Sequence, residues 1–203
     1  MRALVTGFEP FGGETVNPAQ QAVERLAPRL GNVEITTRIL PVAFTRAPPL
    51  LEAAIVETMP DIVLCVGMAG GRAGLSLERV AINIADARIP DNDGQQPAGR
   101  PVVAEGPAAY LATLPIGPAA AALRAAGLPA AVSENAGTFV CNQVFYRLLH
   151  FVARRSMPLR CGFVHVPGPP VRGAHHAGAP AMALADIVRG IAVVLRAVAG
   201  APR

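Results

Sequence analysis

DIVLCVG, residues 61–67, is a short and almost unbroken apolar run that leads into a glycine-rich stretch. A run of this length is typical of a strand at the centre of a parallel sheet, where both faces are buried. Further stretches rich in apolar or β-branched residues indicate strands at 2–7, 32–42, 129–133 and 161–168. Since parallel strands cannot be joined by tight turns, we expect helices between them.

Helical features fill the intervals between these strands. The expected helices cover 17–30, 50–59, 115–127, about 141–154 and 179–200. Asn17 is a favourable N-cap with Pro18 at the first helical position, and Gly127 can close the third helix. The alternation predicts an α/β fold, a three-layer α/β/α sandwich around a mostly parallel mixed central sheet. The 203 residues show no internal repeat and no linker, so we expect one domain over 1–203.

Two stretches depart from this simple alternation. LSLERVAINIADA (75–87) alternates apolar and polar residues, which predicts a longer strand or a hairpin. Residues 88–114 form the longest irregular stretch, headed by RIPDNDGQQPAG, whose prolines, glycines, aspartates and asparagine favour turns at the surface. A loop of this length in a compact domain is often functional.

The composition argues against several classes of protein. All 18 basic side chains are arginine, so no lysine is available for a Schiff base, a P-loop or a Ser–Lys dyad. The net charge of +4 is spread along the chain, and only 4% of residues are aromatic, which argues against nucleic-acid binding. No apolar stretch reaches the roughly 18 residues of a membrane span, and residues 1–13 predict a strand and a turn rather than a signal peptide. We therefore expect a cytoplasmic enzyme or binding protein.

The three cysteines are widely spaced and form no CxxC pair, so neither a zinc site nor a thioredoxin-like motif is expected. Cys65 and Cys161 lie inside predicted strands and are expected to fill the core as free thiols. Cys141, in GTFVCNQVFY (137–146), lies where a helix can begin. There the helix dipole and free N–H groups favour a thiolate and could bind an oxyanion. The alternative is that Cys141 is a small buried core residue.

A thiol nucleophile needs a base, usually a histidine, and a group that orients it. His165, in GFVHVPGPP, lies near the C-terminal end of a predicted strand, and ligands in open α/β sheets bind beyond such ends. A hydrogen-bonded core histidine is an equal alternative. His150 lies late in a helix and His175–His176 lie in a glycine- and alanine-rich loop, so they are weaker candidates and indicate no metal site.

Glu78 is the orienting group that the pattern favours. In LSLERVAINI (75–84) a period of two places it on one face with Val80, Ile82 and Ile84, and a carboxylate on an apolar face needs a partner. The alternative partner to a histidine is an arginine elsewhere in the chain. The aspartates of PDNDG (90–94) are rivals, but they fit roles in turns.

Two loops that follow predicted strands are also candidates for the site. GFEPFGG (7–13) carries Phe8 and Phe11, which either cap the core or line an apolar pocket. GMAGGRAG (67–74) follows the central strand, and neither loop matches the GxGxxG or GK[ST] motif of a phosphate loop. With Cys141 and His165, the two loops predict one site at the edge where these strands end.

Five segments, in this order along the chain, resemble motifs of the pyroglutamyl peptidase I family of cysteine peptidases. They are VTGFEPFGGETVNPA, DIVLCVGMAGGR, LERVAINIADARIPDNDGQQP, AAVSENAGTFVCNQVFY and GFVHVP, and they span nearly the whole chain. The resemblance implies a peptidase that removes an N-terminal pyroglutamyl (5-oxoprolyl) residue from peptides through a thioester intermediate. It also implies a cytosolic homotetramer that needs no cofactor and no metal.

The resemblance assigns roles to individual residues. It implies a catalytic triad of Glu78, Cys141 and His165, which are also the candidates that the residues alone favour. Arg88 and the backbone N–H of Cys141 would form the oxyanion hole, and Phe8 and Phe11 would sandwich the flat pyroglutamyl ring. The implied substrate-binding residues are Phe8, Phe11, Asn17, Met68, Ile89, Phe139 and Val140.

Departures from the family pattern concern the rim of the pocket. Many members have glutamine where this chain has Met68, and VPGPP (166–170) and VRGAHHAGAP (171–180) differ from the usual sequence. They leave open a second hypothesis, a thiol amidase that acts on another small cyclic or acyl amide. A third is a small-molecule binder without catalytic activity.

Overall fold

A computed structural model describes residues 1–168 and 181–202, and within them seven strands form one sheet in the order β2-β3-β1-β4-β9-β5-β8. The bounds are Arg2–Phe8 (β1), Arg29–Leu30 (β2), Val33–Leu40 (β3), Ile62–Ala69 (β4), Leu75–Glu78 (β5), Ala130–Ser133 (β8) and Arg160–Pro167 (β9). Neighbours run parallel, except that β2 is antiparallel to β3 and β5 is antiparallel to β9. The predicted mostly parallel mixed sheet is confirmed, with β4, which holds most of the run 61–67, in its centre.

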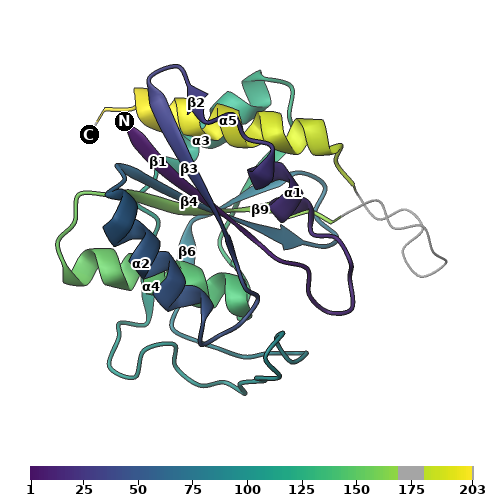
Figure 1. The fold of residues 1–203 in the computed structure, drawn as a ribbon, viewed down its shortest axis with the longest axis vertical. Helices are drawn as coiled ribbons and strands as arrows, with labels where there is room; N and C mark the ends of the chain where they lie inside the picture. The colour runs from purple at the N-terminus through teal and green to yellow at the C-terminus, as the bar shows by residue number, and fades with distance from the viewer. Residues whose placement is uncertain (169–180, 203) are drawn as a thin grey trace.

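Helices cover both faces of the sheet. They are α1 (Pro18–Glu24), α2 (Ala47–Thr58), α3 (Ile116–Ala125), α4 (Val140–Arg154) and α5 (Leu184–Gly200). Helices α1, α3 and α5 lie on one face and α2 and α4 on the other (Figure 1). The predicted three-layer α/β/α sandwich is confirmed.

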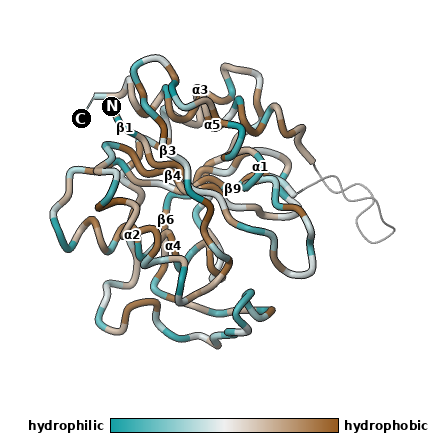
Figure 2. Tube along the Cα trace, viewed as in Figure 1, coloured by the Kyte–Doolittle hydropathy of each residue, from teal (hydrophilic) through white to brown (hydrophobic). Residues whose placement is uncertain are grey.

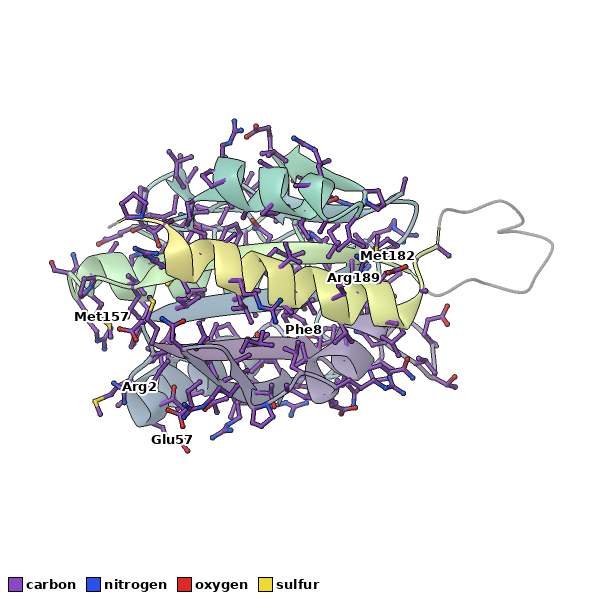
Figure 3. The ribbon with its side chains drawn as sticks, turned by 90° about the horizontal axis from the view of Figure 1, so that it is seen from above. Arg2, Phe8, Glu57, Met157, Met182 and Arg189 are labelled. Atoms are coloured by element: carbon purple, nitrogen blue, oxygen red, sulfur yellow. The ribbon has the colours of Figure 1, made fainter. Side chains whose placement is uncertain are left out.

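The central strand β4 feeds both hydrophobic cores. Ile62, Leu64 and Val66 pack under α1, α3 and α5, while Val63 and Cys65 pack under α2 and α4. Apolar residues gather along the central strands (Figure 2), and Phe8 lies in the interior behind α5 in the view from above (Figure 3). Burial of both faces explains why the strand Ile62–Ala69 contains no charged residue.

The predicted helix 17–30 is too long. Asn17 caps α1 and Pro18 is its first residue, as predicted, but α1 ends at Glu24 and residues 29–30 form β2. Pro28 gives the physical reason, because the residue before a proline is disfavoured in helical conformation.

Two other helices begin at positions that differ from the prediction. Helix α2 starts at Ala47 rather than residue 50, because prolines are tolerated in the first turn. Helix α5 starts at Leu184, after an extended Ala183. Residues 179–180 of the predicted helix 179–200 lie outside the described residues.

The predicted single strand or hairpin over 75–87 is wrong. β5 ends at Glu78, and the chain then enters β6 (Val80–Ile82), which pairs with β7 (Ala109–Leu111) in a separate two-stranded sheet within the described residues. Between them, Arg79 bonds through its N–H to the Ser133 carbonyl and through its carbonyl to the Ala112 N–H. The stretch 88–114, predicted to be irregular, therefore contains β7.

The change of sheet also removes the expected common face. Glu78 is buried, whereas Ile84 is 42% exposed and Ala81 is the buried residue of β6. In the part of the chain that the structure describes, no helix combines the length and the apolarity needed to cross a membrane.

Candidate active site

The sheet places His165 and Glu78 on one face. In β9, His165 lies opposite Gly67 of β4 and Ser76 of β5, and Phe163 lies opposite Glu78. Paired residues, and residues two apart in a strand, point to the same side of a sheet. Both side chains are buried, and His165 Nδ1 lies 2.8 Å from Glu78 Oε1.

Helix α4 brings Cys141 to the same place. Cys141 is the second residue of α4, after the N-cap Phe139, so the helix begins where the sequence predicts. Its Sγ lies 2.9 Å from the position that a Cβ on Gly67 would occupy. Because Gly67 and His165 are paired across β4 and β9, the thiol and the imidazole lie over the same part of the sheet. The structure thus brings Glu78, Cys141 and His165 together.

Burial favours the neutral forms of Cys141 and His165. It raises the pKa of the Cys141 thiol to about 12, and the charges of Cys65 and Glu78 act in the same direction. Burial also lowers the pKa of His165, although the hydrogen bond to Glu78 opposes this shift. Both shifts favour a thiol and a neutral imidazole over an ion pair in the resting site. Such a pair needs proton transfer to make a nucleophile.

A pocket of about 410 Å³ opens above these groups. Among the predicted site residues, its lining contains Phe11, Met68, Arg88, Ile89, Phe139, Cys141 and His165. The pocket also exposes Asp86 and Arg72. Its wall is therefore mainly apolar, with charged groups at a few positions.

The aromatic residues form a cluster at this wall. The ring centroids of Phe11 and Phe139 lie 5.8 Å apart, and Phe44 packs edge-on against Phe139 at 5.3 Å. Phe8 is 2% exposed and packs against Phe163 at 6.2 Å, in the core and not in the pocket lining. Phe8 therefore caps the core and Phe11 lines the pocket, and the structure does not show the sandwich of Phe8 and Phe11 that the resemblance implies.

Two further predicted residues lie behind the pocket. Val140 is buried in the core at the start of α4. Asn17 is buried as well; its Oδ1 accepts from the Ala19 N–H at 2.9 Å, and its Nδ2 donates to the Glu9 carbonyl at 3.1 Å. Asn17 therefore ties the start of α1 to the loop that carries Phe11.

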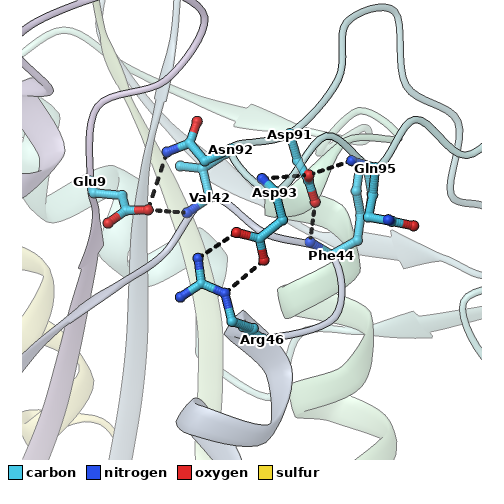
Figure 4. A network of polar contacts seen from close by, with 8 residues as sticks. All are labelled: Glu9, Val42, Phe44, Arg46, Asp91, Asn92, Asp93 and Gln95. Carbon is cyan, nitrogen blue, oxygen red and sulfur yellow. Dashed lines mark hydrogen bonds and ion pairs between the residues drawn. The ribbon is translucent and has the colours of Figure 1, made fainter.

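A polar network fixes the loop that carries Arg88 and Ile89 (Figure 4). The buried Asp91 carboxylate accepts hydrogen bonds from the backbone N–H groups of Phe44, Asp93 and Gln95. In the same loop Asn92 donates through its side-chain amide to Glu9 Oε1 and to the Pro10 carbonyl. The network joins two walls of the pocket. The turn role predicted for the PDNDG aspartates matches these contacts.

Sequence reasoning missed two buried contacts of the site. Arg72 Nη1 lies 2.9 Å from Glu78 Oε1, so Glu78 has both partners that were weighed as alternatives. Asn142, next to Cys141, accepts from the Ile82 N–H and donates to the Ile82 and Ile84 carbonyls. A polar residue directly after the candidate nucleophile was the available signal for Asn142. For Arg72 it was an arginine in the glycine-rich stretch 67–74.

The described residues contain no group of three or more His, Cys, Asp or Glu side chains arranged to hold a metal ion. Residues 169–180, including His175–His176 and most of the two segments that depart from the family pattern, lie outside the described residues.

A model of the pyroglutamyl peptidase family matches residues 1–201. The chain belongs to the pyroglutamyl peptidase family. This confirms the resemblance of the five motifs. It makes the chain an enzyme, a cysteine-type peptidase.

Relatives in the pyroglutamyl peptidase family match almost end to end. A pyrrolidone-carboxylate peptidase from Erwinia tasmaniensis is 53% identical over 188 residues, which are 92% of this chain and 87% of the relative. One from Brevibacillus brevis is 47% identical over 197 residues, 95% of this chain and 90% of the relative. The crystal structure of pyroglutamyl peptidase I from Bacillus amyloliquefaciens has a TM-score of 0.93 at 42% identity and covers 98% of this chain and 95% of that one.

Proposed function

We propose that the chain removes the N-terminal pyroglutamyl residue from peptides with a triad of Cys141, His165 and Glu78. The observation that carries the proposal is the buried 2.8 Å contact between His165 Nδ1 and Glu78 Oε1 beside a pocket that Cys141 lines. The names of the relatives, pyrrolidone-carboxylate peptidase and pyroglutamyl peptidase I, support the substrate class.

His165 is the general base in this mechanism. With Nδ1–H donating to Glu78, Nε2 is left to take the proton of the Cys141 thiol. The sulfur attacks the carbonyl carbon that links the pyroglutamyl residue to the next residue. The imidazolium then protonates the leaving amine, the C–N bond breaks and a thioester remains. Water that gives its proton to His165 hydrolyses the thioester to pyroglutamate and the free thiol.

The oxyanion of the tetrahedral intermediate forms at the start of α4. The Cys141 N–H is one of the backbone donors that a helix leaves free in its first turn. Arg88 lines the same pocket and supplies a cation. A single donor of this kind contributes about 3–4 kcal/mol of transition-state stabilisation in other enzymes.

The pocket wall suits an uncharged ring. A pyroglutamyl residue has no N-terminal ammonium group, so the apolar surface of Phe11, Phe139, Ile89 and Met68 can bind it without leaving a charge unpaired. Phe8 and Val140 support this wall from the core, and Asn17 holds the Phe11 loop. We expect peptides with N-terminal glutamine, which carry a free ammonium group, to be poor substrates.

Met68 supports a second candidate function. Its thioether in the pocket lining cannot donate a hydrogen bond to a lactam oxygen. A thiol amidase for another small cyclic or acyl amide is therefore the alternative. A panel of aminoacyl amides separates the two, with Met68→Gln as the matched variant.

We further propose that residues 1–203 form one peptidase domain. Support comes from the strand order, in which β1 from the N-terminus lies between β3 and β4, and β9 lies between β4 and β5.

A homotetramer is proposed from the family resemblance and is testable by sedimentation. The cytoplasm is proposed because Cys65 and Cys161 are free thiols, as in a reducing compartment. We propose no cofactor, no nucleic-acid partner and no membrane partner.

The decisive experiment measures release of aminomethylcoumarin from L-pyroglutamyl-aminomethylcoumarin. We expect turnover by the wild type and loss of nearly all of it in Cys141→Ala, with Cys141→Ser equally impaired because an alcohol ionises far less readily than a thiol. Absence of turnover by folded, reduced wild type would reject the proposed substrate. Retained turnover in Cys141→Ala would reject the nucleophile.

A further inference from the structure

Glu78 presents one oxygen to two donors. Its Oε1 lies 2.8 Å from His165 Nδ1 and 2.9 Å from Arg72 Nη1, and its side chain has no exposed surface. Its Oε2 has no hydrogen-bond partner among the described residues. A buried carboxylate is costly without compensating partners, so both contacts matter for keeping this group in place.

Arg72 reaches this carboxylate from the pocket. It lies in the loop between β4 and β5, its side chain is 27% exposed, and it lines the pocket together with Cys141 and His165. Its Nη2 donates to the Asn135 carbonyl at 3.2 Å. Asn135 belongs to the loop that leads into α4, and its Oδ1 accepts a hydrogen bond from the Gly137 N–H at 2.8 Å. One guanidinium group therefore connects the orienting carboxylate with the loop before the nucleophile.

We propose that Arg72 is a positioning residue of the active site. Its planar guanidinium holds the Glu78 carboxylate against His165 Nδ1 and holds the loop before Cys141 at a fixed distance from that pair. Two donor nitrogens in a rigid fork can make both contacts at once, which a lysine ammonium on a flexible stem does less well. The inference rests on the proposed triad and adds a fourth residue that acts through Glu78.

The charge of Arg72 also acts on both reacting groups. Beside burial, which dominates, it lowers the pKa of His165 and counteracts the rise in the pKa of Cys141. The other titratable or charged described groups at this place are Glu78 in β5, Cys65 in β4, and Asp86 and Arg88 in the pocket lining. Removal of Arg72 therefore raises both pKa values, and the acid limb of activity moves to higher pH.

The test compares Arg72→Met, which removes the charge at similar length, with Arg72→Lys, which keeps it without the fork. The matched control is Arg79→Met, since Arg79 pairs with Glu134 at 2.6 Å and both side chains are more than half exposed. The pH dependence of kcat and of kcat/KM is measured on L-pyroglutamyl-aminomethylcoumarin. The pH dependence of Cys141 alkylation by iodoacetamide is a second readout that needs no turnover.

For Arg72→Met we expect kcat to fall about 10- to 100-fold, the loss seen when groups that orient the ligands of a metal site are removed, with KM nearly unchanged. We expect the acid limb of kcat/KM to move up by about 0.5 to 1 pH unit. Arg72→Lys should leave the acid limb of kcat/KM at the wild-type pH and retain part of kcat. Arg79→Met should match the wild type. If Arg72→Met does not fold, Arg72→Lys alone tests the inference. We then expect a partial loss of kcat and no shift in the acid limb of kcat/KM.

Three results would overturn the inference: a rise in KM with unchanged kcat, a loss of stability with an unshifted limb, or full activity of Arg72→Met. Failure of the proposed function looks different, because wild type would then not hydrolyse the substrate at all. In that case the alkylation profile still shows whether Arg72 acts on Cys141.

Discussion

At the scale of single residues, the site depends on a glycine as much as on its reactive groups. Gly67 lies beneath the Cys141 sulfur, and a Cβ there would come within 2.9 Å of Sγ and 2.8 Å of the Phe163 ring. Distances this short cannot be kept, so any side chain at residue 67 must displace the nucleophile or the ring that packs against His165. The absence of a side chain at Gly67 allows the Cys141 thiol to approach the sheet.

The first prediction is that Gly67→Ala loses activity. We expect kcat/KM to fall by about 100-fold, since a misplacement near 1 Å can cost that much. Overpacking should lower the free energy of unfolding by about 1–3 kcal/mol. Gly117→Ala is the control, because a Cβ at Gly117 in α3 meets nothing within 4 Å. A fully active Gly67→Ala would show that the Cys141 thiol does not need the space that Gly67 leaves open.

The second prediction concerns the protonation state of the resting enzyme. Burial raises the pKa of Cys141 and lowers that of His165, so we expect both groups to be uncharged at neutral pH. The ultraviolet absorbance of a thiolate, taken as wild type minus Cys141→Ser, should therefore rise only above pH 9. The acid limb of kcat/KM, where His165 gains its proton, should lie below pH 6.5. Thiolate absorbance already present at pH 7 would instead indicate a thiolate–imidazolium pair.

At the scale of elements, the pocket depends on loops that other elements hold. The loop with Arg88 and Ile89 has no strand or helix of its own. It is fixed because Asp91 satisfies three backbone N–H groups, one of them next to the start of α2. Buried N–H groups that lose their acceptor carry a cost of about 1–3 kcal/mol each unless water replaces it.

The third prediction follows from this network. Asp91→Ala should lower the free energy of unfolding by about 2–4 kcal/mol. It should also raise KM several-fold, because Arg88 and Ile89 lose their fixed place. Asp93→Ala is the control, since it removes the side-chain contacts with Arg46 but leaves the three backbone N–H groups bound to Asp91. Equal effects of the two substitutions, measured by denaturation and by kinetics, would contradict a special role of Asp91.

The elements show what local sequence signals can and cannot predict. The apolar run 61–67 and the cap at Asn17 were sufficient for β4 and for the start of α1, because both depend on neighbouring residues. The end of α1 was predictable too, from Pro28. The break after Glu78 was not, since it depends on Ser133 and Ala112, which are distant in sequence and bond the backbone of Arg79.

The same distinction holds for the site. His165 near a strand end and Cys141 at a helix start could be selected from local pattern. Glu78 was selected for a face that it does not share with Ile84, although its buried contact with His165 has the predicted partner. Arg72 was missed, because its one local signal was an arginine in the glycine-rich stretch 67–74 and a salt bridge between a loop and a buried strand leaves no periodic pattern.

At the scale of the whole molecule, the strand order makes the two halves of the chain interdependent. Strands β1 and β4 come from the first third of the chain, and their neighbour β9 comes from the last quarter. Cys65 in β4 and Cys161 in β9 lie in the same core under α2 and α4, and neither has exposed surface. A sheet interleaved in this way is expected to unfold as one unit.

The fourth prediction uses the three thiols to test that unity. In native buffer, iodoacetamide at alkaline pH should modify one thiol per chain, the partly buried Cys141, and Cys141→Ala should show none. With rising denaturant, Cys65 and Cys161 should become reactive together, at the midpoint seen by circular dichroism, because both need the global opening of the sheet. Mass spectrometry of the labelled peptides assigns each site. Reaction of Cys65 or Cys161 at a separate, lower midpoint would show that part of the sheet opens independently, and a single cooperative domain over residues 1–203 would then be wrong.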